Sequence, residues 1–579
     1  MSADEPRKRQ RTCRPKDRPA YPRRRAVQAC CTCRKRRTKC DNEQPACTSC
    51  VDLGIECFYE EKDKSTFDAA SLAILQRLDT LEALVRTGNQ ISTRIQQAPE
   101  ETSPLTTLKN LGSPALERET TANHYYINIE TVLSWHVFHR HNLTGKLDLK
   151  HFLQSEHPRP LPIPISVSSD LETNGAELLQ KFFENVHIYN PILEIATVKQ
   201  YLRDAQFNGF AWDAQSCLLL LVYALGSVPT VHESTVLETS SSYRNSETCR
   251  KAEAFFGAAQ KRMGSLLCHS GVVEAQCFFL AGVYLMATLR PIEAWKMFVQ
   301  ALACCQGFNT HDPTEEERQL QEGIYWTCFK SELELRLELN IANHRVWDLT
   351  YPSFFPSPPK DLKTQGEAAW YFYLAEIALR RLGNRILNYI YTNGLSDTST
   401  ADVVDAVMNF EQQATDWLSS LPPTLRLDQN VDEEGLNSSE NEALRFILNG
   451  HLLDCYEMMY WPFIVEAING RLSNDPESHR LAKKGLLICV QRIDRNESGF
   501  YQRHHGTWLM LRSCTRSALV LLGARLSGLP DLATLEWKGA VEKVIRMLRY
   551  WKDEAKDVPD RLDVLENLMR DVESITNSY

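Results

Sequence analysis

Six cysteines within 28 residues constrain this 579-residue chain more than any other feature. The two halves of the run share the spacing C-x2-C-x6-C, and a short loop that contains Pro45 joins them. Thiolates at such spacings are typical ligands of tetrahedral zinc. Two tetrahedral ions need eight ligand positions, so six sulfurs suffice only if two of them bridge both ions. The candidate ligands are Cys30, Cys33, Cys40, Cys47, Cys50 and Cys57.

Other uses of these cysteines stay open at this point. No histidine precedes His124, so a mixed Cys/His finger is not available in this stretch. Cys31 competes with its neighbour Cys30, although the two-residue spacing to Cys33 favours Cys30 as the ligand. A zinc module that binds protein and a disulfide knot are the remaining alternatives.

The segment from Ala29 to Cys57, ACCTCRKRRTKCDNEQPACTSCVDLGIEC, resembles the fungal binuclear zinc-cluster (Zn2Cys6) transcription factors. The likeness includes the basic run before the third cysteine, Asp41 just after it, and Pro45 before the fourth. It implies two Zn²⁺ ions per chain, with Cys30 and Cys47 as the bridging ligands. So short a module buries too little apolar surface to fold alone, so zinc would supply its folding free energy.

A basic helix is expected directly after Cys33. The resemblance implies that Arg36 and Arg37 approach the bases of a CGG-like triplet in double-stranded DNA, and arginine to guanine is the commonest specific contact. The other basic side chains are expected to contact phosphates, which set affinity without reading sequence. The candidate DNA contacts are Arg34, Lys35, Arg36, Arg37 and Lys39.

The charge of the chain is divided unevenly. Residues 1–57 hold 15 Lys and Arg against 7 Asp and Glu, a net charge of +8, whereas the whole chain carries −9. A local basic footprint is what nucleic-acid binding requires, and the acidic remainder argues against DNA coating by the whole protein. Residues 1–29 are expected to form a disordered basic arm. Its clusters at 6–11 and 22–26 are of the nuclear-import type, with a merely solvated tail as the alternative.

A heptad seam follows the cysteines. Residues 58–70 form a polar linker, residues 71–87 are predicted to form a short coiled-coil dimerisation helix, and residues 88–126 a flexible linker. The alternative for this helix is an amphipathic segment docked on the rest of the protein. We expect a homodimer, because the resembled family dimerises through a coiled coil at this place. The seam consists of Ile74, Leu78, Leu81 and Val85.

From residue 127 to 579 the pattern predicts a mainly α fold with one large all-α domain. Segments such as NPILEIATVKQYL, AEAFFGAAQKRM and IYWTCFKSELELRLELN resemble the fungal-specific transcription factor regulatory domain, or middle homology region. The twelve cysteines outside the cluster are interpreted as reduced thiols, since most lie in apolar stretches. No uncharged run is long enough to cross a membrane. The expected helical stretches are 174–206, 213–228, 250–268, 272–288, 291–307, 316–340, 366–394, 401–420, 440–469, 479–494, 505–527, 533–552 and 560–576.

No catalytic motif is present, so we expect no enzyme. The sequence contains no G-x-G-x-x-G, P-loop, G-x-S-x-G or H-E-x-x-H. The hypothesis that follows is a nuclear, sequence-specific transcription factor for RNA polymerase II genes, regulating a metabolic or biosynthetic gene cluster. Its partners would be DNA and the transcription machinery, and a small-molecule effector is left open. The competing hypotheses are a zinc-dependent protein-interaction module on a helical scaffold and an enzyme with a DNA-binding appendage.

Overall fold

The computed structural model describes residues 30–36, 38, 40–41, 45–58, 127–141, 167–229, 243–308, 314–339, 356, 367–392, 400–427, 439–472 and 475–576. The chain divides into two compact units, Met1–Ile91 and Ser92–Tyr579, and each is described by itself. The expected basic arm, coiled coil and 88–126 linker lie outside the described residues, as does the 58–70 linker apart from Phe58.

The first unit contains two short helices, α1 (Cys31–Arg36) and α2 (Thr48–Asp52). Each begins directly after the first cysteine of a half-repeat, Cys30 or Cys47. The buried core consists of four cysteines, against which Cys40, Ile55 and Cys57 pack. The equal spacing of the two halves therefore appears in the structure as two equivalent helical turns around a core of sulfur.

The second unit, which we call the body, is built of helices throughout its described residues. Its α-helices are α4 (Ile129–Leu133), α6 (Val167–Asn185), α7 (Ile195–Asn208), α8 (Ala214–Gly226), α9 (Glu247–Leu266), α10 (Val272–Ala287), α11 (Pro291–Cys305), α12 (Glu315–Glu338), α14 (Glu367–Leu387), α15 (Thr400–Ser420), α16 (Ser439–Ile468), α17 (Pro476–Asn496), α18 (Thr507–Leu526), α19 (Trp537–Trp551) and α20 (Val558–Thr576). Short 3₁₀ turns and one π turn, η6 (Asn388–Thr392), join some of them. The predicted mainly α fold is confirmed.

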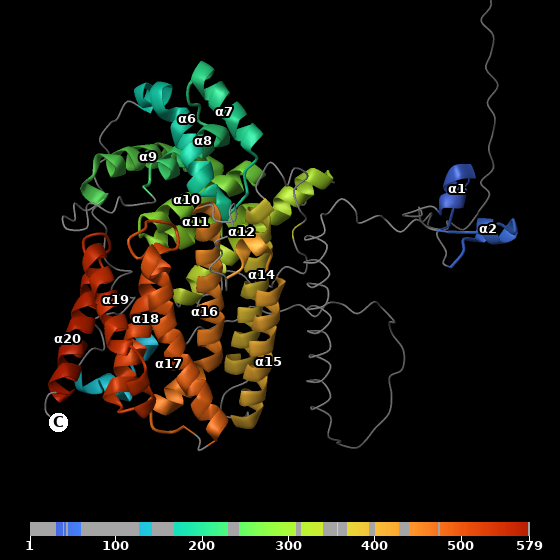
Figure 1. The fold of residues 1–579 in the computed structure, drawn as a ribbon. Coiled ribbons are helices and arrows are strands. Elements are labelled where there is room, and N and C mark those ends of the chain that lie inside the picture. The colour runs from blue at the N-terminus through green and yellow to red at the C-terminus, as the bar shows by residue number, and fades with distance from the viewer. Residues whose placement is uncertain are drawn as a thin grey trace, which may run out of the picture. The chain divides into compact units, whose positions relative to one another are not determined.

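Neighbours in sequence are mostly neighbours in space within the body. Helix α10 packs against α8 and α11, and α11 packs against α12. Helices α14, α16, α17 and α18 form a second chain of contacts, with α19 and α20 packed against α18 (Figure 1). The small α4 also packs on α18, so the first described helix of the body contacts one that lies far along the chain.

The most deeply buried helices are apolar on every side. All residues of α10 from Ala275 to Ala287 are buried, and so are those of α8 from Ser216 to Gly226. A helix without a polar face belongs in the centre of a large core. Close packing is visible at Gly226, where an added Cβ would collide with the carbonyl oxygen of Leu178 on α6. These two helices therefore form the centre of the N-terminal half of the body.

One predicted element is divided in the structure. The single stretch expected over residues 174–206 forms α6 and α7, separated by the 3₁₀ turn η2 (His187–Tyr189) and an irregular connection. Pro191 explains the break, because proline disfavours helical backbone at the preceding residue and lacks a backbone N–H group. The apolar periodicity of the sequence continues across the break, because both helices turn an apolar face toward the core.

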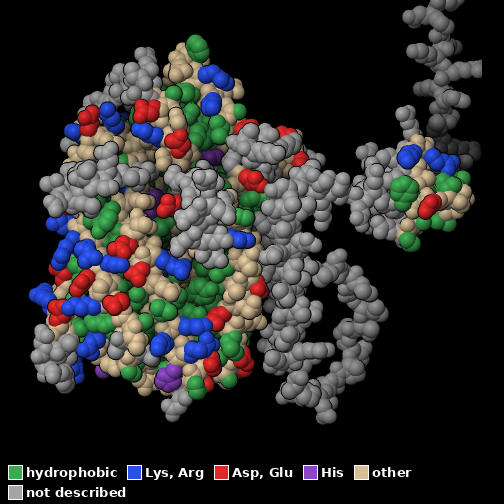
Figure 2. Space-filling view, in the orientation of Figure 1, with side chains coloured by type: hydrophobic (Ala, Val, Ile, Leu, Met, Phe, Trp, Pro, Cys, Tyr) green, Lys and Arg blue, Asp and Glu red, His purple; other side chains and the backbone are tan. Residues whose placement is uncertain are grey.

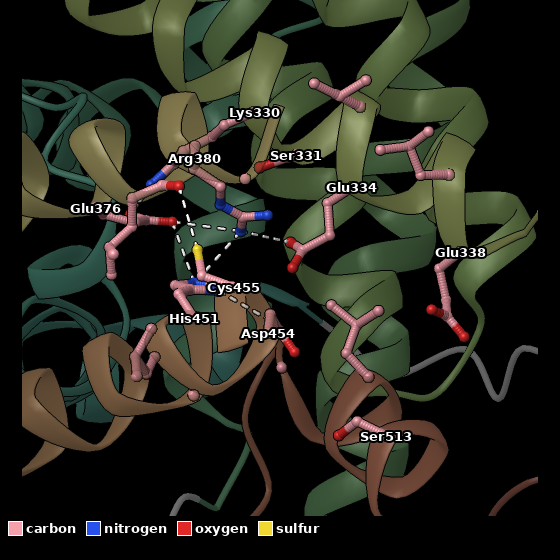
Figure 3. Close-up of a pocket in the computed structure, with 18 of the residues that line it drawn as sticks. Lys330, Ser331, Glu334, Glu338, Glu376, Arg380, His451, Asp454, Cys455 and Ser513 are labelled. Atoms are coloured by element: carbon pink, nitrogen blue, oxygen red, sulfur yellow. Dashed lines mark hydrogen bonds and ion pairs between the residues drawn. The ribbon is translucent and has the colours of Figure 1, made fainter. Parts of the chain in front are cut away.

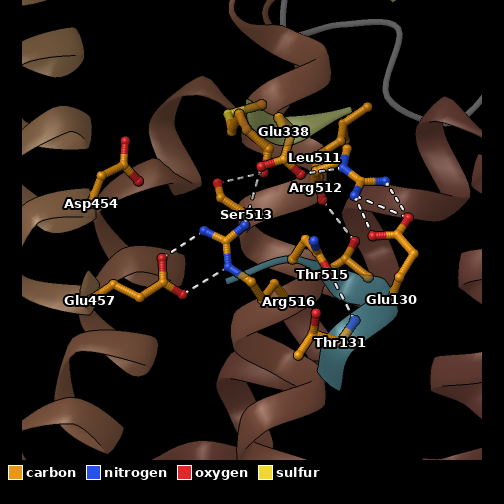
Figure 4. Close-up of polar contacts among 12 residues, drawn as sticks. Glu130, Thr131, Glu338, Asp454, Glu457, Leu511, Arg512, Ser513, Thr515 and Arg516 are labelled. Atoms are coloured by element: carbon orange, nitrogen blue, oxygen red, sulfur yellow. Dashed lines mark hydrogen bonds and ion pairs between the residues drawn. The ribbon is translucent and has the colours of Figure 1, made fainter. Parts of the chain in front are cut away.

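A network of buried charges ties distant helices of the body together (Figure 4). Arg516 on α18 binds Glu457 on α16 at 2.6 Å and Glu338 on α12 at 3.7 Å. Arg512, one turn earlier, binds the same Glu338 and also Glu130 on α4, at 2.9 Å. Each arginine is about 98 % buried, so removing one partner would leave an uncompensated charge. The network fixes how four helices meet.

Two further predictions concern composition. The described cysteines of the body are buried except for the exposed Cys268, as expected for thiols in an apolar core. Among the described residues, no helix is long and apolar enough to cross a membrane.

Candidate zinc centre and basic helix

Four sulfurs meet at one point in the N-terminal unit. The Sγ of Cys30 lies 3.7 Å from those of Cys47 and Cys50, and the Sγ of Cys33 lies 3.6 and 3.9 Å from the same two atoms. Four ligands at a Zn–S distance of about 2.3 Å on a tetrahedron are separated by about 3.8 Å. The sulfur positions therefore fit tetrahedral thiolate coordination of zinc.

The last cysteine of each half closes on its own half and approaches the other sulfurs. The backbone N–H of Cys30 donates to the Sγ of Cys40 at 3.4 Å, and that of Cys47 donates to the Sγ of Cys57 at 3.3 Å. The thiol of Cys57 also interacts with those of Cys30, Cys47 and Cys50. Cys40 lies with Cys47 in a second group of potential metal ligands. All six predicted ligands thus converge.

Burial makes these sulfurs unsuitable as free thiolates. Cys30, Cys47 and Cys50 are completely inaccessible to solvent. Burial raises the pKa of the Cys50 thiol to about 12, so it stays protonated near neutral pH. A cation in the cluster removes this penalty by neutralising the thiolates, and metal binding then releases protons. The donor set is one that suits Zn²⁺.

Asp41 has a structural role that the sequence did not reveal. Its carboxylate accepts hydrogen bonds from the backbone N–H of Thr48, at 3.1 Å, and from the Thr48 hydroxyl. It therefore satisfies an N–H group in the first turn of α2, as a helix cap does. On the other side, the hydroxyl of Thr32 donates to the carbonyl of Glu56 at 2.9 Å. These two contacts join the halves of the module through polypeptide groups alone.

The basic residues lie on α1, directly beside the sulfur core. Lys35 and Arg36 are exposed, and Arg34 belongs to the same helix. Figure 2 shows basic side chains together on this small unit, whereas acidic and basic side chains are interspersed on the visible face of the body. Arg37 and Lys39 lie outside the described residues, as do the side chains of Arg34 and Cys31. A short helix anchored by buried cysteines thus holds two cations in the solvent.

The predicted dimerisation residues lie outside the described part of the chain, so the structure does not test the seam. They are Ile74, Leu78, Leu81 and Val85.

The N-terminal unit combines a cysteine cluster with an exposed basic helix, and the remaining described residues form a helical body. This combination defines a class of zinc-dependent DNA-binding regulator. Comparison with protein families agrees with this class: residues 28–66 match the fungal Zn(2)-Cys(6) binuclear cluster domain. The N-terminal module is therefore a binuclear cluster whose six cysteines bind two zinc ions.

Similarity to known regulators extends through the body. The chain is 23% identical over 490 residues to "Putative transcription factor ecdB" of Aspergillus rugulosus, which covers 77% of this chain and 80% of that protein. It is 22% identical over 559 residues to "Thiamine repressible genes regulatory protein thi1" of Schizosaccharomyces pombe, covering 82% of this chain and 68% of that protein. A shorter match, 46% over 48 residues, is to "Transcription factor FBD3" of Fusarium pseudograminearum; it covers 8% of this chain and 6% of that protein.

These comparisons confirm the resemblance inferred from the cysteines. The chain carries a fungal zinc-cluster domain and is related over most of its length to fungal transcription factors, so it is a DNA-binding regulator of transcription. Its relatives are named as transcription factors, in agreement with the prediction that it is not an enzyme.

Proposed function

We propose that the protein acts in the nucleus and recognises CGG-like triplets through α1. Arg36 reads guanine, Arg37 acts beside it, and Lys35 contacts phosphate. The observation that supports this proposal is the exposure of Lys35 and Arg36 on a helix whose Cys33 is buried in the cysteine cluster. A rigid mount for arginine suits bidentate recognition of a base edge, since little conformational entropy is lost on binding.

The remaining parts of the proposal rest on the sequence. Cys30 and Cys47 serve as the bridging thiolates, as the resemblance to the fungal binuclear zinc-cluster family implies. Residues 71–87 join two chains into a homodimer, which would place two readers on paired triplets. The targets would be RNA polymerase II genes of a metabolic or biosynthetic cluster, reached with the help of the transcription machinery. The competing hypothesis, a zinc-dependent protein-interaction module, gives no reason for a basic helix.

Selection of binding sites from random DNA by the full-length, zinc-loaded protein tests the proposal. We expect enrichment of paired CGG-like triplets. Arg36→Ala should then weaken binding to the selected site by about 1–3 kcal/mol and relax its base preference. Lys35→Ala, its neighbour on the same helix, is the matched control: it should weaken all sequences equally and lower the salt dependence.

Zinc content measured on each variant separates loss of contact from loss of folding. If no triplet is enriched, or if both variants lose equally on selected and random DNA, α1 does not read bases. Sedimentation of the complex on paired triplets counts the protein chains bound and so checks the proposed dimer.

A further inference from the structure

A partly open cavity lies in the C-terminal half of the body, lined by α12, α14, α16, α17 and α18 together with the segments before α7 and α18 (Figure 3). Its volume is about 230 Å³. A cavity of about 150 Å³ accommodates benzene, so this one has room for an organic molecule of roughly ten non-hydrogen atoms. Its apolar wall includes Phe329, Leu337, Phe372 and Phe446.

The polar wall of the cavity is a connected set of charges. Arg380 binds Glu334 at 2.9 Å and Glu376 at 3.5 Å, and its guanidinium lies 3.3 Å from the Nε2 of His451. The Nδ1 of His451 in turn lies 3.6 Å from Asp454 (Figure 3). A connected polar surface from α12, α14 and α16 therefore lines the cavity, together with apolar residues of the same helices.

The solvent accessibility of the charged groups, rather than their number, determines the electrostatic character of this polar surface. Four permanent cations and four carboxylates line the cavity. His451 adds a further positive charge when protonated: burial lowers its pKa, but hydrogen bonds to Asp454 and Glu376 outweigh burial and raise the pKa above its ordinary value. The side chains of Lys330, Arg492 and Arg516 are only 6%, 2% and 2% accessible, and each is paired with a carboxylate. Glu334 and Asp454 are 25% and 34% accessible. Arg380, at 19%, is the most accessible of the lining cations and already contacts two carboxylates.

Asp454 remains ionised in this position. Burial alone would raise the pKa of its carboxyl group, but the charges of Arg492 and His451 outweigh burial and hold the pKa below its ordinary value. His504 and His505, which also line the cavity, are neutral because burial lowers their pKa values to about 3 and about 4. These two histidines therefore add no positive charge opposite the carboxylates.

An unpaired acceptor lies in the same wall. The side chain of Asn190 is about nine-tenths buried, lines the cavity, and its Oδ1 atom accepts no hydrogen bond from the protein. A buried acceptor without a donor is unfavourable, and a bound N–H group would satisfy it. Asn190 therefore favours the same kind of ligand as the accessible carboxylates, a molecule that donates hydrogen bonds.

We propose that this cavity binds a small organic cation, an amine of roughly ten non-hydrogen atoms with an apolar ring or chain. Its ammonium group meets Glu334, Asp454 and Asn190, and its apolar part packs against the phenylalanines that line the cavity. The inference concerns the body alone and does not depend on how α1 reads DNA.

Three probes with a common carbon skeleton test the charge requirement. 2-Phenylethylamine, 2-phenylethanol and 3-phenylpropionate are titrated calorimetrically into the full-length, zinc-loaded protein. We expect one amine bound per chain, at millimolar concentration or below, with a rise in the melting temperature of the body. The alcohol and the carboxylate should bind at least about ten-fold more weakly, because charged hydrogen bonds are lost.

Two pairs of variants locate the site. Glu334→Gln should weaken amine binding by about ten-fold, whereas Glu466→Gln, which alters an exposed carboxylate paired with Arg471 outside the cavity, should not. An added Cβ at Gly450, which lines the cavity on α16, would meet no atom within 4 Å. Gly450→Leu should therefore fill the space and abolish binding, while Gly450→Ala should retain it and leave the fold intact.

Three results would overturn the proposal. Equal binding of alcohol, carboxylate and amine would show that the cavity selects no cation. Amine binding that survives Gly450→Leu would place the site elsewhere. Absence of amine binding at millimolar concentrations, with the variants folded, would mean that the cavity holds water only.

Discussion

The zinc module and the helical body obtain their stability from opposite sources. Among the described residues of the module, the buried core consists of four cysteines, and Ile55 is the one side chain other than cysteine that packs at their edge. The body buries large side chains from its helices, among them Trp326, Trp508 and Trp551. A metal therefore replaces the apolar core in the module, whereas the body depends on packing. The comparison teaches that one chain can contain two folding units that respond to different perturbations.

Removal of zinc should give the largest difference between the units. A chelator should unfold the module and abolish DNA binding, since structural zinc contributes on the order of 10–16 kcal/mol in comparable small domains. The body should be unaffected. All 11 tryptophans lie after residue 91, so tryptophan fluorescence reports on the body alone.

Zinc content, DNA binding and the tryptophan melting curve are measured on the same sample. Cys31→Ser is the control, and it should retain two zinc ions because Cys31 is not among the six ligands. A shift of the tryptophan transition on chelation would show that the two units are coupled.

Loss of one buried charge should destabilise the body and leave the module intact. Glu457 is 1% exposed and binds Arg492 at 2.9 Å and Arg516 at 2.6 Å. Glu457→Gln should lower the free energy of unfolding by about 3–5 kcal/mol, because two buried guanidinium groups lose their shared partner. Glu477→Gln, which affects the exposed pair with Arg480, should cost no more than about 1 kcal/mol.

Urea unfolding followed by tryptophan fluorescence measures both variants, and zinc content should stay unchanged. Equal losses from the two substitutions would mean that the buried network contributes nothing beyond a surface ion pair.

These two units also differ in how far the sequence predicts them. The cysteine cluster is local, since its ligands span 28 residues and their spacing alone implies the metal. Most body helices follow from apolar periodicity, which each segment carries by itself. The division between α6 and α7 was missed because both flanking helices are amphipathic, although Pro191 was a visible signal.

Contacts between distant segments were beyond prediction. Glu130 and Arg512 are 382 residues apart, and nothing near either residue indicates the other as its partner. The cavity likewise depends on how five helices meet, and no single helix encodes it. Asp41 matched a family pattern, but its contact with Thr48 depends on how the loop between the halves folds back.

Mild acid should destabilise the body through its buried histidines. Burial lowers the pKa of His187 from 6.5 to about 4, so the unfolded chain binds this proton more readily than the folded protein does. Stability contributed by neutral His187 is therefore complete above pH 6.5 and is lost as pH falls toward 4. By pH 5 the loss should be on the order of 2 kcal/mol.

Chemical denaturation at pH 7 and pH 5, again followed by tryptophan fluorescence, measures how the free energy of unfolding depends on pH. His187→Asn should reduce the pH dependence, with the remainder carried by His504 and His505, whereas His479→Asn, at an exposed position of α17, should leave it unchanged. A pH dependence that is unchanged in His187→Asn would mean that this histidine does not contribute to it.

The smallest effect should come from the one polypeptide contact that caps α2. Asp41→Ala removes the acceptor for the N–H group of Thr48, and loss of a helix cap costs about 1 kcal/mol. In a module whose folding is coupled to metal, this cost should appear as a zinc affinity lowered about five-fold, while the body is unchanged. Asp41→Asn keeps an acceptor oxygen and should retain most of the affinity, and Asp52→Ala, at the end of the same helix, is the control for lost charge. Competition with a chromogenic chelator measures the zinc affinity of all three variants.

Asp41 lies with Cys40 and Cys47 in a group that could also hold a metal, so the number of zinc ions bound per chain must be measured as well. If Asp41→Asn binds two zinc ions with near-normal affinity, Asp41 acts as a cap. If this variant loses one ion, Asp41 is a zinc ligand in addition to the six cysteines.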